Sequence, residues 1–578
     1  MENGLSYISS DQASTAPYTT VPKLLQKWAS LKPDQDAFVF YNQDLIRRSI
    51  TYNRLYKDSV KLAKGLVSKG LGRDDIVGVG GNNTPEWLVS AFAVQLAGAR
   101  PIHFPFLDKS GNTIKEFLNN VGGCSMLIFD PGHEDGHWKT IQNLATVDPE
   151  TGFVRKSDIV SLKWVVLESP LNSSEKILTI SDLFCDEDIK LPKIDPDDIA
   201  VILTTSGSTG RPKLIQGSHY FLIENGQRLG KAGVIDYLRE KQEPFIYFND
   251  RPFYWGGGYP CCELAYGGTR VTISSTLAFP SISDTIDFLS KIIKREKPSS
   301  GFIIVPFLLE IISRDSFPWK FHSVITGGQP VPAKCLDGIG KYYDVISDTY
   351  GNTEIGVLAV NISRSSFTST GKVPAEGIEI KVIGPDERMV PLGEKGEIAV
   401  RSCPSFRGYV NDEERNKKVL TPSGWYKTDD LGHITKDGRL EVLGRVSDVM
   451  LISGSKVLPS VIEAIIRKHP GIKDVVVFPI KDVKHADDVP CAAVIRKEGV
   501  KVTENALREF VRREIDTDEE AVFIENIYVP KHIVFHNEDF PKTQTGKIDR
   551  NATRNLSIPR IEETRYNAIF SYGNKPTI

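Results

Sequence analysis

The feature that most limits how this chain can fold is the stretch Thr204 to Lys213, which reads TTSGSTGRPK. It follows directly on the apolar run Ile199 to Leu203, a pattern typical of a buried strand. Glycine lets the backbone approach a ligand closely, and backbone N–H groups, hydroxyls and a lysine together favour phosphate oxygens. The spacing differs from a Walker A loop, and Ser206 stands where a hydrolase nucleophile elbow needs glycine. We therefore expect a strand followed by a phosphate-binding loop.

Helix-like and strand-like patterns alternate along the rest of the chain. Residues 56–69 and 86–96 have helical periodicity, whereas 125–130, 163–169 and 301–307 are short apolar runs typical of strands. This alternation predicts an α/β fold, in which sheets are covered by helices. After Gly444 the pattern becomes that of a compact α+β unit. We therefore predict a large N-terminal domain over residues 1–447 and a small C-terminal domain over residues 448–578.

Composition narrows the class of partner. The 578 residues carry a net charge of -3, so no excess of basic side chains points to nucleic acid. The seven cysteines include no Cys-x-x-Cys pair, and the first twenty residues do not resemble a targeting signal. No apolar run reaches the roughly 18 to 20 residues that span a bilayer. We expect a cytoplasmic protein with small-molecule partners, no transmembrane segment and no indication of its oligomeric state.

One short motif points to a different class of function. Residues 133–137 read HEDGH, which satisfies the His-Glu-x-x-His pattern of zinc metalloproteases. That site requires a helix that places both histidines on one face. A turn-forming Asp-Pro-Gly precedes the motif, and Gly136 costs about 1 kcal/mol of helix stability relative to alanine. We therefore expect a turn here rather than a zinc site.

The stretch 204–213 closely resembles the phosphate loop of the adenylate-forming superfamily, which includes acyl-CoA and aryl-CoA synthetases, peptide-synthetase adenylation domains and firefly luciferase. Further segments resemble the same superfamily in the expected order, and the resemblance extends from about Val21 to Arg550. These segments are Gly327-Gly328-Gln329-Pro330, Tyr350-Gly351-Asn352-Thr353-Glu354, Gly424 to Asp430, Gly444 to Asp448, and Pro541 to Ile548.

The resemblance implies roles for individual residues. It assigns catalysis to Lys547, Glu354 and Lys213, and Mg²⁺ binding to Glu354 and Thr205. The hinge between domains would lie at Asp448. The residues that it assigns to ATP are Thr205, Ser206, Gly207, Ser208, Thr209, Gly210, Gly328, Gln329, Tyr350, Gly351, Asn352, Thr353, Asp430 and Arg445.

The implied reaction is ATP-dependent activation of a carboxylic acid to an acyl-adenylate, with transfer to a thiol, for which CoA is the expected co-substrate. Tyr254 to Gly258, Val305 to Leu309 and Ile355 to Ala359 would line the acid pocket, and their composition indicates a largely apolar acid. An α-amino acid would need a carboxylate partner for its ammonium group. Asp250 is the nearby candidate.

Four positions depart from the superfamily pattern: Leu214, Trp255, Asp429 and Leu451. Leu214 and Leu451 weaken the CoA assignment more than the adenylation assignment, and Trp255 replaces a common histidine near the acid carboxylate. We expect Asp429 to lie in an extended segment, where neighbouring side chains point to opposite faces, so that Asp430 alone faces the ribose. Two alternatives stay open: an adenylating enzyme with another acceptor, such as a carrier-protein thiol, an amine or oxygen, and a catalytically reduced nucleotide-binding homologue.

Overall fold

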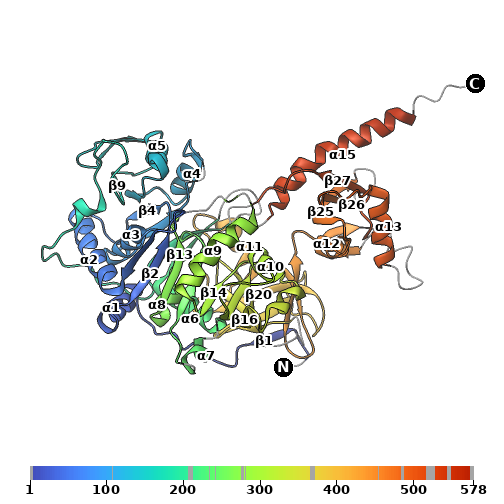
Figure 1. Cartoon of the computed structure of the whole chain (residues 1–578), viewed down its shortest axis with the longest axis horizontal. Helices are drawn as coiled ribbons and strands as arrows, with labels where there is room; N and C mark the ends of the chain where they lie inside the picture. The colour runs from blue at the N-terminus through green and yellow to red at the C-terminus, as the bar shows by residue number, and fades with distance from the viewer. Residues whose placement is uncertain are drawn as a thin grey trace, which may run out of the picture.

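The computed structural model describes residues 4–106, 108–205, 213–233, 235–240, 242–274, 279, 281–364, 371–452, 455–482, 487–515, 528–542 and 548–572. A large N-terminal region carries a separate, smaller domain formed by the C-terminal residues, which are coloured orange to red in Figure 1. This arrangement is the predicted α/β fold with an additional α+β domain. The predicted boundary at residue 447/448 stays a prediction.

Two mainly parallel sheets form the body of the N-terminal region. The first has the order β18-β17-β16-β15-β14-β12-β13-β2-β3, with bounds Val373–Pro374, Gly356–Ser363, Tyr343–Asn352, Phe321–Gly327, Ser300–Phe302, Ile246–Phe248, Thr269–Ile273, Asp36–Tyr41 and Arg47–Thr51. The second has the order β11-β10-β5-β4-β6-β9, with bounds Lys213–Ser218, Ile199–Thr205, Arg100–Phe104, Ile76–Gly80, Met126–Phe129 and Trp164–Leu167. Antiparallel pairs lie at the edges of both sheets.

Helices fill the space between these sheets. The helix α3 (Pro85–Leu96) is buried on nearly every side, as expected of a helix enclosed by two sheets. The hydrophobic core around α3 includes side chains from both sheets, from α1 (Val21–Leu31) and α2 (Tyr52–Ser68), and from α6 (His219–Ala232). Thr84 caps α3 by accepting a hydrogen bond from the Trp87 backbone N–H at 2.9 Å. The helical patterns at 56–69 and 86–96 therefore correspond to real helices.

Two further helical layers cover the outer faces. The helices α4 (Asn112–Asn120) and α5 (Gly136–Gln142) pack on the second sheet, and α9 (Ile282–Glu296) and α10 (Val305–Ser313) pack on the first. The apolar run 301–307 is not one strand as expected. Strand β14 ends at Phe302, and α10 begins at Val305 with Pro306 in its first turn, where proline is well tolerated.

A third sheet was not anticipated from the sequence. It is antiparallel, with the order β1-β19-β20-β21-β22 and bounds Tyr7–Ser9, Ile378–Ile383, Gly396–Ser402, Tyr426–Ile434 and Leu440–Arg445. The first strand comes from the N-terminus and pairs with a strand nearly four hundred residues later. The pairing of β1 with β19 is distant in sequence, so local patterns give no signal for it, whereas β19 to β22 follow one another along the chain.

The C-terminal domain is built on a three-stranded sheet, β25-β26-β27 (Ile472–Asp482, Asp487–Arg496, His532–His536), and a hairpin, β23-β24 (Met450–Ile452, Ser455–Val457). Its helices are α12 (Pro459–Arg467), α13 (Glu504–Ile515) and α15 (Arg550–Tyr572), and α15 extends away from the domain in Figure 1. Among the described residues, no helix is long and apolar enough to cross a membrane.

The remaining elements are short. They are β7 (Ala145–Val147), β8 (Val154–Ser157), α7 (Ile235–Glu240), α8 (Cys262–Tyr266), α11 (Glu413–Val419), and the 3-10 turns η1 (His133–Asp135), η2 (Ile180–Leu183) and η3 (Ala333–Gly338).

Candidate active site

The predicted phosphate loop joins two antiparallel strands. Strand β10 ends at Thr205, whose partner in β11 is Lys213. Ser206, Gly207, Ser208, Thr209 and Gly210 lie outside the described residues, as does the side chain of Thr205.

Lys213 is described, and its Nζ lies 5.2 Å from the centre of the Tyr409 ring. Burial lowers the pKa of Lys213, whereas the nearby Glu354 carboxylate opposes that shift.

Glu354 occupies the turn between β16 and β17, and its side chain is 7% exposed. The Tyr409 hydroxyl donates to Oε1 of Glu354 at 2.6 Å and lies 3.2 Å from the Tyr426 hydroxyl. Burial and the adjacent Glu354 carboxylate raise the pKa of Tyr409, so this phenol stays protonated and available as a donor. The buried Tyr409 phenol therefore holds the predicted Mg²⁺ ligand in place, and the Tyr426 phenol contacts Tyr409 from behind it.

Sequence reasoning assigned no role to Tyr409 or Tyr426. Tyr426 lies inside a recognised motif, but Tyr409 follows Gly408 in a segment that lacks a motif. The signal that could have found Tyr409 is an aromatic residue next to a glycine with positive φ, which is weak without a structure.

A second cluster forms around Asp430. The Tyr350 hydroxyl donates to Oδ2 of Asp430 at 2.6 Å, and Nε of Arg445 lies 3.1 Å from Oδ1. Thr428 contacts both members of the Asp430–Arg445 ion pair. Its hydroxyl accepts a hydrogen bond from the Asp430 backbone N–H at 3.1 Å, and its carbonyl accepts one from Arg445 at 3.1 Å. Burial raises the pKa of Asp430, and the Arg445 charge counteracts this. The structure thus brings together the predicted adenine and ribose residues Tyr350, Asp430 and Arg445.

Asp429 lies in the strand β21, as expected of an extended segment, but at a β-bulge where its own backbone is not extended, so simple alternation of side chains does not explain where its carboxylate points. Its φ is +61°, in the left-handed region that favours glycine. Its carboxylate accepts hydrogen bonds from the Ser447 backbone N–H at 3.2 Å and from the Ser447 hydroxyl at 2.7 Å. The side chain is therefore bound to the segment that precedes Asp448, and the left-handed backbone agrees with the glycine usual at this position.

The glycine-rich segment lies beside Tyr350, because β15 pairs with β16 in parallel and Gly327 is opposite Thr349. Gly328 has a φ of +76°, and Gln329 follows it at the end of this strand. Gly351 allows close contact across the hairpin, since a Cβ there would lie 2.3 Å from the Gly356 carbonyl oxygen.

Asn352 and Thr353 complete that hairpin. The Asn352 side chain accepts from the Ile355 backbone N–H at 3.0 Å. Thr353 faces the loop that carries Trp255, because a Cβ added at Gly256 would lie 3.2 Å from the Thr353 side chain. The predicted nucleotide and acid segments are therefore neighbours.

The loop predicted to contact the acid carries Trp255, which is one of the departures from the superfamily pattern. Trp255 packs edge-on against Phe302, with ring centres 6.1 Å apart. Asp250, the candidate partner for an α-amino group, is 6% exposed and is bound by the Arg251 guanidinium through Nε at 2.9 Å and Nη2 at 2.5 Å. Its charge is already compensated, which argues against a free α-amino acid as substrate.

The other two departures lie away from the Asp430 cluster. Leu214 is 4% exposed and belongs to the core beneath the second sheet. Leu451 is 46% exposed in β23, and its backbone N–H donates to Asp488.

Burial raises the pKa of Asp448, the predicted hinge residue, and the positive charges of Arg550 and Arg445 oppose that shift.

Lys547 lies outside the described residues, and its role stays a prediction. The described residues on either side of it are joined: Lys542 and Ile548 form an antiparallel bridge, and the Asp549 backbone N–H donates to the Pro541 carbonyl at 2.8 Å. Arg550 then donates to Oε2 of Glu463 in α12 at 2.6 Å. This segment is therefore attached to the core of the C-terminal domain at its base.

The HEDGH motif does not form the helix that a zinc site needs. Glu134 and Asp135 have φ values of 50° and 59°, and α5 begins only at Gly136. The His137 ring stacks on Phe106 with centres 4.0 Å apart, and its Nδ1 lies 3.0 Å from the Asp130 carbonyl oxygen. Across the described ranges, no three His, Cys, Asp or Glu side chains are grouped to hold a metal.

The structure brings together residues predicted to bind the nucleotide, and comparison with known proteins identifies the class of protein. The chain belongs to the AMP-binding enzyme family, whose model matches residues 25–410, and the model of the AMP-binding enzyme C-terminal domain matches residues 461–547. The predicted membership of the adenylate-forming superfamily is confirmed.

Relatives span nearly the whole chain. The putative acyl-CoA synthetase YngI of Bacillus subtilis (strain 168) is 23% identical over 569 residues, which cover 94% of this chain and 97% of the relative. The mitochondrial medium-chain acyl-CoA ligase ACSF2 of Danio rerio is 26% identical over 580 residues, covering 95% and 90%. The 4-coumarate–CoA ligase 2 of Petroselinum crispum is 26% identical over 523 residues, covering 88% and 89%.

Solved structures share the fold. The O-succinylbenzoate coenzyme A synthetase of Bacillus subtilis in complex with AMP has a TM-score of 0.70 and 20% identity, covering 92% of this chain and 98% of its own. The amide bond synthetase McbA of Marinactinospora thermotolerans has a TM-score of 0.70 and 21% identity, covering 93% and 99%.

The protein is thus an AMP-forming acid:thiol ligase, as predicted. The expectations of ATP, Mg²⁺ and CoA agree with these findings, because the curated relatives are CoA ligases and one structural neighbour was solved with ATP and magnesium ion.

Proposed function

We propose that this protein joins a largely apolar carboxylic acid to CoA in two steps at one site. The acid carboxylate attacks the α-phosphorus of ATP, the bond between the α- and β-phosphates breaks, and pyrophosphate leaves. The CoA thiol then loses its proton and attacks the carbonyl carbon of the acyl-adenylate, and AMP leaves. The domain boundary at 447/448 and a cytoplasmic location are part of this proposal and rest on the sequence.

The observation that carries the proposal is the convergence of four predicted residues from separate elements. Lys213 opens β11, Glu354 lies in the β16–β17 turn, Asp430 belongs to β21 and Arg445 ends β22. The charges of Glu354 and Arg445 act on Lys213, and those of Arg445 and Glu354 act on Asp430, so these groups share one electrostatic environment. Charged groups that gather from separate elements into one buried place support a shared ligand.

Each residue suits one part of the reaction. Lys213 would neutralise the outer phosphates, and the Asp430 carboxylate would accept hydrogen bonds from the ribose hydroxyls. Glu354 fits Mg²⁺, because magnesium is commonly held by one or two carboxylates together with substrate phosphates. Bound there, the ion would neutralise charge on the phosphates. Lys547 would bridge the carboxylate and the α-phosphate during the first step.

The acid itself is inferred from the loop around Trp255. That loop presents an indole and glycines, and α10 presents aliphatic and aromatic side chains. The relatives named above act on medium-chain acids and on 4-coumarate, which are both largely apolar. We therefore expect a fatty or aryl acid without an ammonium group.

The test is acid-dependent pyrophosphate release from ATP and Mg²⁺ over a panel of fatty, aryl and amino acids, with and without CoA. Acid-dependent release with an acyl-CoA product detected by mass supports the proposal. Release without a thioester would favour an adenylating enzyme that uses another acceptor. Binding of ATP with no release for any acid would favour the catalytically reduced nucleotide-binding homologue.

A further inference from the structure

A fully buried arginine spans the loop that carries Trp255. Arg270, in β13, is 0% exposed. Its Nε and Nη2 donate to the Asn249 carbonyl at 3.2 and 3.1 Å, Nη2 also donates to the Arg251 carbonyl at 3.0 Å, and Nη1 donates to the Gly258 carbonyl. One rigid guanidinium therefore joins both ends of the loop 249–258.

The charge of Arg270 is compensated within the core. Oε1 of Glu263, in α8, lies 3.8 Å from Nη1 of Arg270, and both side chains are 0% exposed. The guanidinium also lies 4.9 Å from the centre of the Phe253 ring. A buried ion pair gains little stability over apolar residues of similar volume, so its benefit here is geometric.

Other polar side chains hold the same loop. Oδ1 of Asn249 accepts from the Arg251 backbone N–H at 3.0 Å, and its amide donates to the Gly257 carbonyl at 2.9 Å. Asn83, in the loop between β4 and α3, accepts from the Phe253 backbone N–H at 2.8 Å. The backbone on both sides of Trp255 is thus fixed by hydrogen bonds.

We propose that Arg270 is a positioning residue that sets which acids this ligase accepts. It holds the backbone of the loop 249–258, so that Trp255 and Gly256 meet the acid in one fixed arrangement. This inference rests on the proposed function, because it concerns the acid pocket of that same site. Arg270 has no direct contact with substrate in this role.

The first test is Arg270→Lys. Lysine keeps the charge but replaces the planar fork with one ammonium group, which has too short a reach to join both ends of the loop. We expect the KM for the acid to rise about tenfold and the ratio of kcat/KM between a short and a long acid to change at least fivefold. The KM for ATP should stay within twofold.

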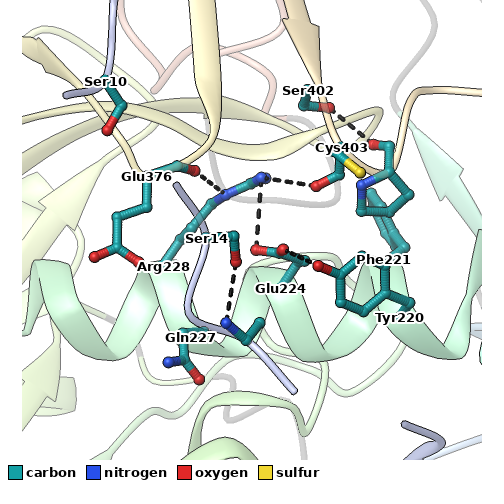
Figure 2. A network of polar contacts seen from close by, with 12 residues as sticks. Ser10, Ser14, Tyr220, Phe221, Glu224, Gln227, Arg228, Glu376, Ser402 and Cys403 are labelled. Atoms are coloured by element: carbon teal, nitrogen blue, oxygen red, sulfur yellow. Dashed lines mark hydrogen bonds and ion pairs between the residues drawn. The ribbon is translucent and has the colours of Figure 1, made fainter. Parts of the chain in front are cut away.

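A matched control separates this role from the general effect of changing a buried arginine. Arg228, in α6, has similar surroundings (Figure 2): it donates to the Glu376 carbonyl at 3.0 Å and the Cys403 carbonyl at 3.3 Å, and it lies 3.6 Å from Glu224. It does not contact the acid loop. Arg228→Lys should lower Tm without changing the ratio of kcat/KM between acids.

If Arg270→Lys fails to fold, Asn83→Ala takes its place, and the ratio of kcat/KM between a short and a long acid is again the quantity measured. This change removes two hydrogen bonds to the loop, at Phe253 and Arg251, from the opposite side. An unchanged acid ratio, or equal rises in the KM for acid and ATP, would overturn the role of Arg270. A wild-type protein without acid-dependent pyrophosphate release would instead refute the proposed function, and this inference with it.

Discussion

Replacement of Asp430 by alanine should weaken ATP binding far more than it weakens the fold. The side chain is 12% exposed, and its carboxylate accepts from Tyr350 at 2.6 Å and lies 3.1 Å from Arg445, so it is held in one orientation before the nucleotide arrives. A hydrogen bond to a charged group contributes about 1.5 to 3 kcal/mol, and the proposed role gives Asp430 two ribose hydroxyls. The lower limit of about 3 kcal/mol corresponds to a rise of about 100-fold in the Kd for ATP.

The effect on folding should be smaller, because Arg445 is 52% exposed and can be solvated when its partner is lost. Calorimetry with ATP and Mg²⁺ measures the first effect, and thermal unfolding measures the second. Asp437→Ala is the matched control, since Asp437 lies in the turn of the same β21–β22 hairpin and is 62% exposed. A folded Asp430→Ala protein that binds ATP within threefold of wild type would refute the ribose assignment.

Three further predictions follow from other parts of the molecule. Lys547→Ala should reduce ATP- and acid-dependent pyrophosphate release about 100-fold or more, whereas thioester formation from supplied acyl-adenylate should stay within threefold; equal losses would contradict its role. Asp429→Gly should leave ATP affinity within twofold and Tm nearly unchanged, because relief of the left-handed backbone offsets the lost bonds to Ser447. Burial raises the pKa of the Glu168 carboxyl above 4.5 in the folded protein. The stability that this carboxyl contributes in its protonated form is therefore complete below pH 4.5 and is lost as the pH rises through the folded pKa. The Tm of Glu168→Gln, relative to wild type, should therefore increase by about 1 to 3 °C between pH 4.5 and pH 8, and a constant difference would contradict this.

Local patterns in the sequence predicted the elements that have local causes. The helices α2 and α3 follow from apolar periodicity, and strand β10 follows from an apolar run. The residues Tyr350, Asp430 and Arg445 came from motifs, and the structure joins them by a hydrogen bond and an ion pair. The motifs occur in the order typical of the superfamily, so the resemblance predicted that these residues lie close together. Their spacing in the sequence does not predict this by itself.

Features that depend on distant contacts could not be predicted in this way. Tyr409 reaches Glu354 across 55 positions of sequence, and β1 pairs with β19 across more than 370. The pairing of Asp250 with Arg251 is local, but two adjacent charges in a sequence do not indicate whether their side chains meet or diverge. The left-handed backbone of Asp429 also escaped prediction, because aspartate rarely adopts it without a partner such as Ser447.

Three of the departures from the superfamily pattern lie at positions predicted to serve other parts of the reaction than the Asp430 cluster. Trp255 packs against Phe302 in the loop predicted to contact the acid, Asp429 binds Ser447 beside the predicted hinge, and Leu451 is exposed on the C-terminal domain. None of these side chains replaces a hydrogen-bonding partner of Asp430. If the loop 249–258 receives the acid as proposed, a homologue reduced to nucleotide binding would have no requirement for a buried arginine that braces this loop. The departures are therefore better explained by a change in acid or acceptor than by loss of catalysis.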